Sequence, residues 1–287
     1  TNYDKVQAAI ALASVLAAGS VVIRGNADFV VQVPAAGVLN IRSGMTLAHM
    51  DVVVAGATTT PVVFAEDGND MGLFDVRIDC AGLNTVAAVF GRGCWGITLR
   101  GVVIHDFKGR SIDLKSNWAT SRKALRDVEL DGVFIHTPRV GVGFGMLIGT
   151  DTLGGWVKNV RINRLQFFGD NPSAPAERPR RYAADAADWT ADMLVCHGVD
   201  GLTISNSILA MSGAAAMSLT RGCRNVRVFD TLASRTEESV NIGSAFTAIY
   251  VADIRGFEID NPVGMTIFKP ISSGDAGVSK GDLSGMI

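Results

Sequence analysis

The sequence predicts an all-β fold, a single-stranded right-handed parallel β-helix with an N-terminal capping α-helix. The first observation is a repeated triplet of apolar, polar and apolar residues between about residues 76 and 267. The second is its spacing, because successive triplets start 21, 31, 32, 42, 24 and 23 residues apart. Repeat units as short as 21 to 24 residues can bury their apolar faces only by stacking on one another, as in solenoid proteins. The triplets begin at Val76, Ile97, Val128, Val160, Leu202, Val226 and Ile249.

Each coil is predicted to hold three short strands, and the solenoid roughly eight to nine coils. The triplet forms the second strand, and a third apolar run such as Val102-Val103-Ile104 follows it. An apolar residue seven positions before the triplet marks the first strand, in which alternate residues face the core. The predicted core-facing residues of the first strand are Phe90, Leu114, Ile148, Val195, Leu219, Ile242 and Ile267.

The two ends of the chain differ from the coils. Residues 2–18 form a predicted amphipathic helix that stops at Gly19, and such a helix covers the open end of a solenoid. We therefore assign residues 1–25 to the capping helix and first strand, 26–271 to the β-helix and 272–287 to a tail. The tail is rich in Gly and Ser, so we expect a further domain or an oligomer to cover that end.

Composition excludes several function classes. The chain has 287 residues, 48% of them hydrophobic, and a net charge of −2, which argues against general nucleic-acid binding. It has no apolar run long enough to span a membrane. The four cysteines form no Cys-x-x-Cys pair, and we predict that they are buried thiols. No carboxylate cluster suggests calcium, so we expect neither a metal nor another cofactor.

The order of the opening segments resembles a known group of proteins. A helix, small residues, the strand Val21–Gly25 and then coils resembles the pectate-lyase-like β-helix superfamily, closest in pattern to bacteriophage tailspikes and polysaccharide depolymerases. The resemblance implies binding and cleavage of a bacterial surface polysaccharide, a homotrimer, and an extracellular or virion-associated location. Polygalacturonase-type members cluster aspartates on the outer face of one sheet, and this chain lacks that cluster.

Three inserts account for the long steps. They are predicted near residues 117–124, 152–156 and 169–191, on consecutive coils, where they flank the outer face of the first strand. Loops on a rigid scaffold commonly carry binding and catalysis. Three of the four tryptophans and two basic runs lie within or beside these inserts. Aromatic rings pack on sugar rings and cations attract anionic groups, so the inserts predict an acidic glycan as ligand.

Two cleavage chemistries are consistent with these residues. A lyase needs a cation beside the substrate carboxylate and a base, whereas a hydrolase needs two carboxyl groups. The predicted catalytic residues are Asp113, Lys115, Asp151, Tyr182, Asp185 and Asp188. The predicted substrate-binding residues are Trp118, Arg122, Lys123, Trp156, Arg180, Arg181, Trp189 and His136.

His105 and His136 hold the same position on adjacent coils, eight residues after their triplets. Neighbouring strands are about 5 Å apart, so the two imidazoles are predicted to stack, either as a proton-transfer or ligand site or as an aromatic contact. The overall alternatives also stay open. One is a polysaccharide-cleaving enzyme, and the other is a non-catalytic β-helix that serves as a shaft, adhesin or glycan receptor.

Overall fold

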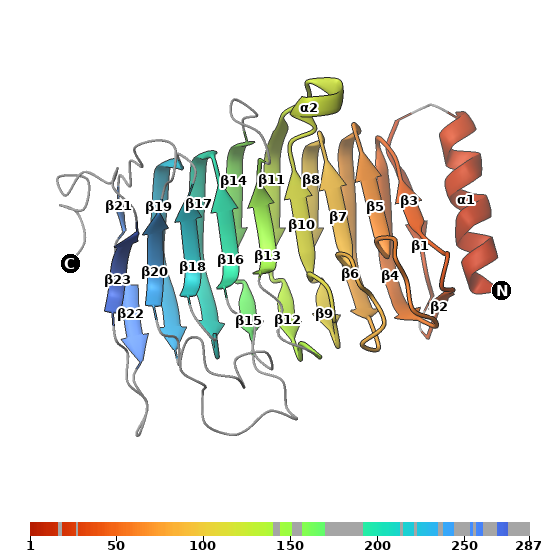
Figure 1. The fold of residues 1–287 in the computed structure, drawn as a ribbon. Coiled ribbons are helices and arrows are strands. Elements are labelled where there is room, and N and C mark those ends of the chain that lie inside the picture. The colour runs from red at the N-terminus through yellow and green to blue at the C-terminus, as the bar shows by residue number, and fades with distance from the viewer. Residues whose placement is uncertain are drawn as a thin grey trace.

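The computed structural model describes residues 1–16, 19–26, 28–139, 144–150, 157–169, 192–212, 215–220, 223–234, 238–243, 253–254, 257–260 and 269–274. Strands dominate these residues, and all their ladders are parallel. The strands stack along one axis, from the helix α1 at the N-terminal end to β23 near the C-terminal end (Figure 1). This architecture confirms the predicted parallel β-helix.

A nine-stranded sheet contains the first strand of each coil. In spatial order it consists of β3 (Leu39–Ile41), β5 (Val63–Glu66), β7 (Val89–Arg92), β10 (Ile112–Lys115), β13 (Phe144–Gly149), β16 (Asp192–His197), β18 (Ala215–Thr220), β20 (Glu238–Gly243) and β23 (Lys269–Gly274).

A fourteen-stranded sheet contains the second and third strands. The second-strand row consists of β1 (Val21–Arg24), β4 (Met45–Val54), β6 (Asn69–Asp79), β8 (Trp95–Arg100), β11 (Leu125–Asp131), β14 (Val157–Asn163), β17 (Val199–Ala210), β19 (Arg224–Ser234) and β21 (Asp253–Ile254). The strands β4, β6, β17 and β19 continue into the third-strand row, which also contains β2 (Val30–Val33), β9 (Val103–His105), β12 (Phe134–His136), β15 (Gln166–Phe168) and β22 (Phe257–Asp260).

The bend between the second and third strands has a repeated backbone conformation. Asn206 and Asp230, which follow the second strand, have φ of 50° and 49°. Asp75, Gly101 and Gly132 occupy the matching place on other coils, with φ of 53°, 63° and 63°. This left-handed region suits Gly, Asn and Asp, because a short polar side chain or none avoids the steric clash. Most coils use these residue types at the bend, whereas His49 and Arg164 hold the same register position with φ of 51° and 54°.

One of the predicted triplets is assigned wrongly, and another lies outside the described residues. Ile97 pairs with Met71, and Arg77 pairs with Val103, so the triplet at Val76 belongs to the third-strand row. At the other end Ile254 pairs with Val228, and the predicted triplet at Ile249 lies outside the described residues. Apolar alternation marks a strand but cannot identify its row, because second and third strands carry the same pattern.

The predicted inward column is also wrong at two positions. Four of the predicted residues are aligned in register as expected. Leu114 pairs with Ile148, Leu219 pairs with Ile242, and Cys196 pairs with both Ile148 and Leu219. In this column β7 contributes Gly91 and β16 contributes Cys196, instead of the predicted Phe90 and Val195. The turns after β7 and β16 are one residue shorter than the assumed spacing, and a shift of one residue moves a side chain to the opposite face. Ile267 lies outside the described residues.

The helix α1 (Asn2–Leu16) covers the N-terminal end of the core. Val6 and Ile10 are buried against the first coils. The Tyr3 hydroxyl accepts a hydrogen bond from the Val38 amide at 3.1 Å, and Asn2 Nδ2 donates to the Val30 carbonyl at 2.9 Å. These contacts satisfy backbone groups that the first strands would otherwise leave unpaired.

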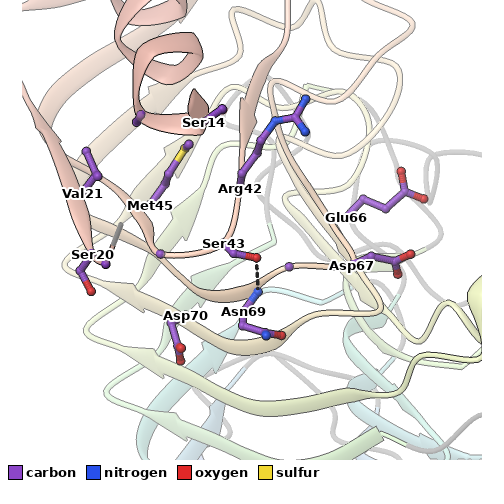
Figure 2. Close-up of a pocket in the computed structure, with 14 residues that line it drawn as sticks. Ser14, Ser20, Val21, Arg42, Ser43, Met45, Glu66, Asp67, Asn69 and Asp70 are labelled. Atoms are coloured by element: carbon purple, nitrogen blue, oxygen red, sulfur yellow. Dashed lines mark hydrogen bonds between the residues drawn. The ribbon is translucent and has the colours of Figure 1, made fainter. Parts of the chain in front are cut away.

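A pocket of about 640 Å³ lies between the C-terminal part of α1 and the turns after β3 and β5 (Figure 2).

Among the described residues, no helix has the length and apolarity needed to cross a membrane. All four cysteines are free and buried, as predicted, and burial raises the pKa of the Cys80 thiol.

Candidate functional site

The predicted acid–base pair lies on β10. Asp113 Oδ2 is 3.5 Å from Lys115 Nζ and also contacts Arg110 Nη1. Asp113 alternates with the core residue Leu114 and therefore faces outward, but only 6% of its side chain is exposed. The sequence correctly predicted that the two side chains lie together on one face of this strand, and the catalytic roles of both residues stay predictions. A substrate would reach it only if the covering groups moved.

Other predicted residues cannot be placed. The predicted catalytic residues Asp151, Tyr182, Asp185 and Asp188 lie outside the described residues. The same holds for the predicted substrate-binding residues Trp156, Arg180, Arg181 and Trp189. The roles of all eight therefore stay predictions.

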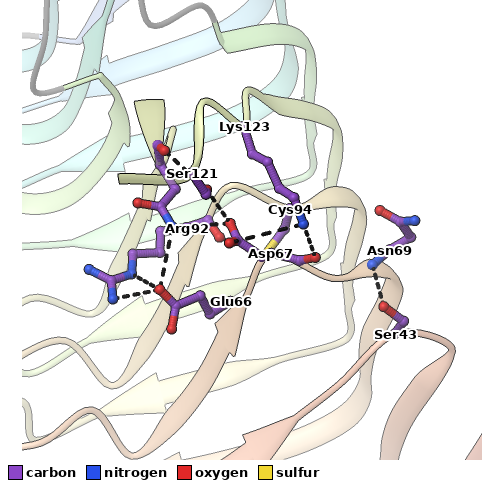
Figure 3. A network of polar contacts seen from close by, with 9 residues as sticks. Ser43, Glu66, Asp67, Asn69, Arg92, Cys94, Ser121 and Lys123 are labelled. Carbon is purple, nitrogen blue, oxygen red and sulfur yellow. Dashed lines mark hydrogen bonds and ion pairs between the residues drawn. The ribbon is translucent and has the colours of Figure 1, made fainter. Parts of the chain in front are cut away.

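The insert at 117–124 connects β10 to β11 and contains the one-turn helix α2 (Trp118–Ser121). Its anchor is Asp67, which lies in the turn after β5, on an earlier coil (Figure 3). Asp67 Oδ1 accepts hydrogen bonds from Asn117 Nδ2 at 3.0 Å and from Ser121 Oγ at 2.9 Å. Lys123 Nζ donates to the Asp67 carbonyl at 3.0 Å. The insert is thus fixed by three donors that converge on one residue.

Gly93 allows this close approach. It has φ of 63°, and a Cβ atom built on it would lie 2.3 Å from Asp67 Oδ1 and 2.7 Å from Asn117 Cβ. Both distances are far below van der Waals contact, so a side chain at this position would push Asp67 and the insert apart. The glycine is therefore required by sterics as well as by its positive φ.

Three of the predicted substrate-binding residues lie on this anchored insert. The Arg122 guanidinium lies 5.9 Å from the centre of the half-buried Trp118 ring, and Arg122 is exposed. Lys123 is exposed as well, although its ammonium group contacts Asp67. The insert therefore places an aromatic ring and two cations at the turn between β10 and β11.

A row of aromatic and basic residues runs along the adjoining edge of the second-strand row. Trp95, Arg126 and Lys158 are neighbours in register on β8, β11 and β14, and we call them the cationic ridge. The Trp95 side chain is 45% exposed. The Arg126 guanidinium lies 4.9 Å from the centre of its ring, within the range of a cation–π interaction.

Arg126 has an unsatisfied donor. Its Nε is buried and makes no hydrogen bond with the part of the chain that the structure describes. A buried donor without an acceptor costs about 1–3 kcal/mol, but a ligand does not reach an enclosed atom, so Arg126 would act through its charge and its place beside the ring. The ridge therefore offers an exposed aromatic surface and positive charge to an anionic ligand.

The ridge borders an elongated trough of about 620 Å³. Asp127 and Asn159, which follow Arg126 and Lys158 directly, line one side of it. The trough also includes Arg161, Thr203 and Arg227, so it extends over four neighbouring coils, from β11 to β19. Three strand spacings correspond to about 14 Å. This shape suits an extended ligand.

Trp95, Arg126 and Lys158 are not among the residues predicted for the site. The signal was present, because each residue lies two positions before its triplet, at Ile97, Val128 and Val160. Residues with the same offset on consecutive coils become neighbours in a solenoid. These three residues lie outside the long inserts at 152–156 and 169–191, and their shared offset is the feature that identifies them.

The predicted histidine stack is confirmed. His105 and His136 pair in register, and their rings lie 5.3 Å apart at an angle of 9°. Arg77 Nε donates to His105 Nε2 at 3.1 Å, so the ring proton of neutral His105 is on Nδ1, which lies 2.9 Å from Asp106 Oδ2. Arg139 Nε lies 2.6 Å from the other oxygen of Asp106. Five residues from three coils thus form one contact chain.

The same place contains a possible cation-binding group. Asp79, His105 and Asp106 bring one imidazole and two carboxylate atoms within 4.8 Å of one another. A metal on His105 Nδ1 would have to displace the proton that Arg77 keeps there, and Arg139 already balances the charge of Asp106. The donor set therefore fits a hydrogen-bonded cluster better than a metal centre.

No known protein family and no curated protein matches the sequence. Solved structures with a similar backbone include the A-modules of two mannuronan C-5 epimerases of Azotobacter vinelandii. AlgE4 has 14% identity and a TM-score of 0.41, and the match covers 96% of this chain and 95% of that one. AlgE6 has 13% identity and a TM-score of 0.37, with coverage of 96% and 94%.

Tailspike protein 3 of bacteriophage CBA120 has 9% identity and a TM-score of 0.40, over 91% of this chain and 48% of the tailspike. The likeness to these proteins concerns the fold alone. The strand register of this chain establishes its parallel β-helix, and its own residues carry the functional argument.

Proposed function

We propose that this β-helix binds an acidic polysaccharide along the cationic ridge and the adjoining trough. The observation that carries the proposal is the exposed Trp95 ring with the Arg126 guanidinium 4.9 Å from its centre. The indole face suits the C–H face of a sugar ring, and a guanidinium suits a carboxylate, which it binds through two parallel hydrogen bonds.

The size and charge of the surroundings support a polymer as ligand. The trough continues the ridge over four coils and contributes Arg161 and Arg227, with Thr203 as a hydroxyl partner. Glu129 is paired with Arg100 at 3.0 Å, whereas Asp127 accepts only from the neutral amide of Asn159 at 3.0 Å in the part of the chain described, so one carboxylate charge remains beside two guanidinium groups. Cations therefore remain available over a length that exceeds one sugar unit.

Cleavage is a second candidate function, which the pairing of Asp113 with Lys115 favours. A carboxylate and an ammonium group together supply the base and the cation that a uronate lyase needs. The burial of Asp113 favours the non-catalytic alternative, a glycan receptor or shaft. A new ultraviolet absorbance from unsaturated ends would indicate a lyase, and new reducing ends without it would indicate a hydrolase.

The proposal implies an extracellular or virion-associated protein, because acidic capsule and exopolysaccharide chains lie outside the cell. A homotrimer stays a prediction, and sedimentation equilibrium tests it directly.

Affinity electrophoresis in gels containing alginate, polygalacturonate or hyaluronan tests the proposed binding, with neutral dextran as the ligand control. Trp95→Ala should weaken retardation by about tenfold, since a stacked aromatic contact is lost. Leu12→Ala is the matched control, because Leu12 is an exposed apolar residue on α1. If no acidic polymer retards the protein, or if Trp95→Ala behaves like Leu12→Ala, the proposal is wrong.

A further inference from the structure

The insert at 117–124 adjoins the cationic ridge. Its Arg122 is four positions from Arg126, so the Cα atoms of the two arginines are at most about 14 Å apart. The Arg126 amide donates to the Cys94 carbonyl at 3.0 Å, which fixes the end of this connection beside Trp95. An extended ligand that lies on the ridge can therefore also reach the insert.

Hydrogen bonds fix the insert at its base and against an earlier coil. The Asn117 amide donates to the Lys123 carbonyl at 2.8 Å and closes the loop at its base. Asp67 Oδ1 accepts from Asn117 Nδ2 and from Ser121 Oγ, and the Asp67 carbonyl accepts from Lys123 Nζ (Figure 3). Two of these bonds end on a single side-chain oxygen, so the position of the insert depends on Asp67.

The carboxylates beside the insert are already matched by cations. Arg92 Nη2 lies 2.5 Å from Glu66 Oε1, and Lys123 Nζ lies 4.0 Å from Asp67 Oδ2. Lys123 therefore serves as an anchor of the insert and balances the charge of Asp67. The other cation of the insert is Arg122, which has no acidic partner in the part of the chain that the structure describes.

Arg122 is placed to contact a ligand. It is exposed, and its guanidinium lies 5.9 Å from the centre of the Trp118 ring. This distance is within the range of a cation–π interaction, which restricts the directions in which the guanidinium can point. Its side chain makes no hydrogen bond with any described residue, so its N–H groups are available. The insert thus repeats, four residues earlier, the pairing of Arg126 with Trp95.

We propose that Arg122 binds a second acidic unit of the polysaccharide that lies on the ridge, and that Asp67 is the positioning residue that holds Arg122 there. The inference rests on the proposed function and adds a subsite to it. The ligand is then a chain with at least two acidic units. One lies beside Arg126, and the other contacts Arg122, because a planar guanidinium suits a carboxylate.

Isothermal titration with hexagalacturonate tests the subsite. Arg122→Gln removes one exposed charge and should weaken binding about two- to fivefold at low ionic strength, with a smaller effect in high salt. Arg24→Gln is the matched control, because Arg24 is exposed on β1, three strands before β8, and should leave the affinity unchanged. Equal affinities for the two variants would contradict the subsite.

Two substitutions at Asp67 separate its effect on position from its charge. Asp67→Ala removes the acceptor of Asn117 and Ser121, so it should weaken binding as much as Arg122→Gln does. The double variant should be no weaker than either single variant, because both changes remove the same contact. Asp67→Asn keeps an Oδ1 acceptor and tolerates the φ of 51°, so it should bind at least as tightly as the wild type.

Additive losses in the double variant would show that Asp67 does not act through Arg122. An equal loss for Asp67→Asn and Asp67→Ala would also contradict the positioning role. If Asp67→Ala does not fold, Ser121→Ala takes its place, because it removes one of the two donors to Asp67 Oδ1 and should give part of the same loss.

The outcomes separate the two proposals. Binding that depends on Trp95 but does not respond to Arg122→Gln contradicts the insert inference and leaves the ridge intact. Failure of every acidic probe to bind, or binding that Trp95→Ala leaves unchanged, contradicts the proposed function and the insert inference with it.

Discussion

The Arg126 guanidinium lies 4.9 Å from the centre of the Trp95 ring, although the two residues are 31 positions apart in the sequence. Their strands, β8 and β11, are direct neighbours, and the 117–124 insert accounts for the extra chain between them. The same insert is held on Asp67, two first-sheet strands before β10. The ridge and the anchored insert are therefore parts of one local arrangement.

Arg126→Lys should weaken acidic polysaccharide binding by about tenfold. Lysine keeps the positive charge, but it loses the planar donor pair and part of the stacking on the indole. Titration of the variant against the best acidic polymer measures this. Lys5→Arg on α1 is the control, because Lys5 is exposed on the capping helix. Equal affinities for the wild type and Arg126→Lys would show that charge alone, without stacking, accounts for binding.

Gly93→Ala should destabilise the protein more than Gly132→Ala. Both glycines have φ of 63°, so both variants bear the cost of about 1 kcal/mol for a side chain in the left-handed region. At Gly132 the nearest atoms to an added Cβ are 3.9 Å away, whereas at Gly93 the Asp67 carboxylate is 2.3 Å away. Urea unfolding of the two variants measures the difference, and equal losses would contradict the steric role of Gly93.

His105→Phe should cost about 1–3 kcal/mol of unfolding free energy. Phenylalanine keeps the ring stack on His136 but removes both ring nitrogens, which leaves Arg77 and Asp106 without their shared partner. His136→Phe is the control, since it keeps the stack and loses the contact with Thr137, while the contacts of His105 with Arg77 and Asp106 stay in place. Chemical denaturation distinguishes a hydrogen-bonded cluster from a purely aromatic contact, for which the two variants would be equally stable.

Removal of Arg164 should make stability less dependent on pH in the acid range. Its guanidinium donates to both oxygens of Asp131, at 2.9 Å and 2.6 Å, and holds the pKa of that carboxyl below its usual range. A depressed pKa contributes stability above the pKa of the unfolded state, and this is lost as the pH falls through the folded value. Arg164→Ala should therefore be less stable than the wild type at neutral pH, and the gap should close in acid. A gap that stays constant down to strongly acidic pH would contradict this assignment.

The four thiols should be unreactive in the native protein. All are buried, and burial raises the pKa of the Cys94 thiol and, more strongly, that of Cys196. The thiolate is the reactive form, so a raised pKa slows alkylation. Mass spectrometry after iodoacetamide treatment should find no label in the native state and four labels after unfolding. Rapid native labelling would mean that a coil opens readily.

The sequence by itself determined the β-helix, the N-terminal cap, the buried cysteines and the stacked pair His105–His136. These follow from local alternation, a repeat period and a shared offset, which are properties of the linear chain. The pairing of Asp113 with Lys115 followed in the same way, because both lie on the same face of one short strand.

Only the tertiary structure decided the relations between coils. Turn length set whether Phe90 or Gly91 faces the core, and a difference of one residue reverses the two faces. The burial of Asp113, and the stacking of Arg126 on Trp95 across 31 positions, depend on how neighbouring coils pack. Hydrophobic periodicity predicts which residues are buried. It does not predict which residues of neighbouring coils contact each other, because that alignment depends on the lengths and packing of all the turns and inserts.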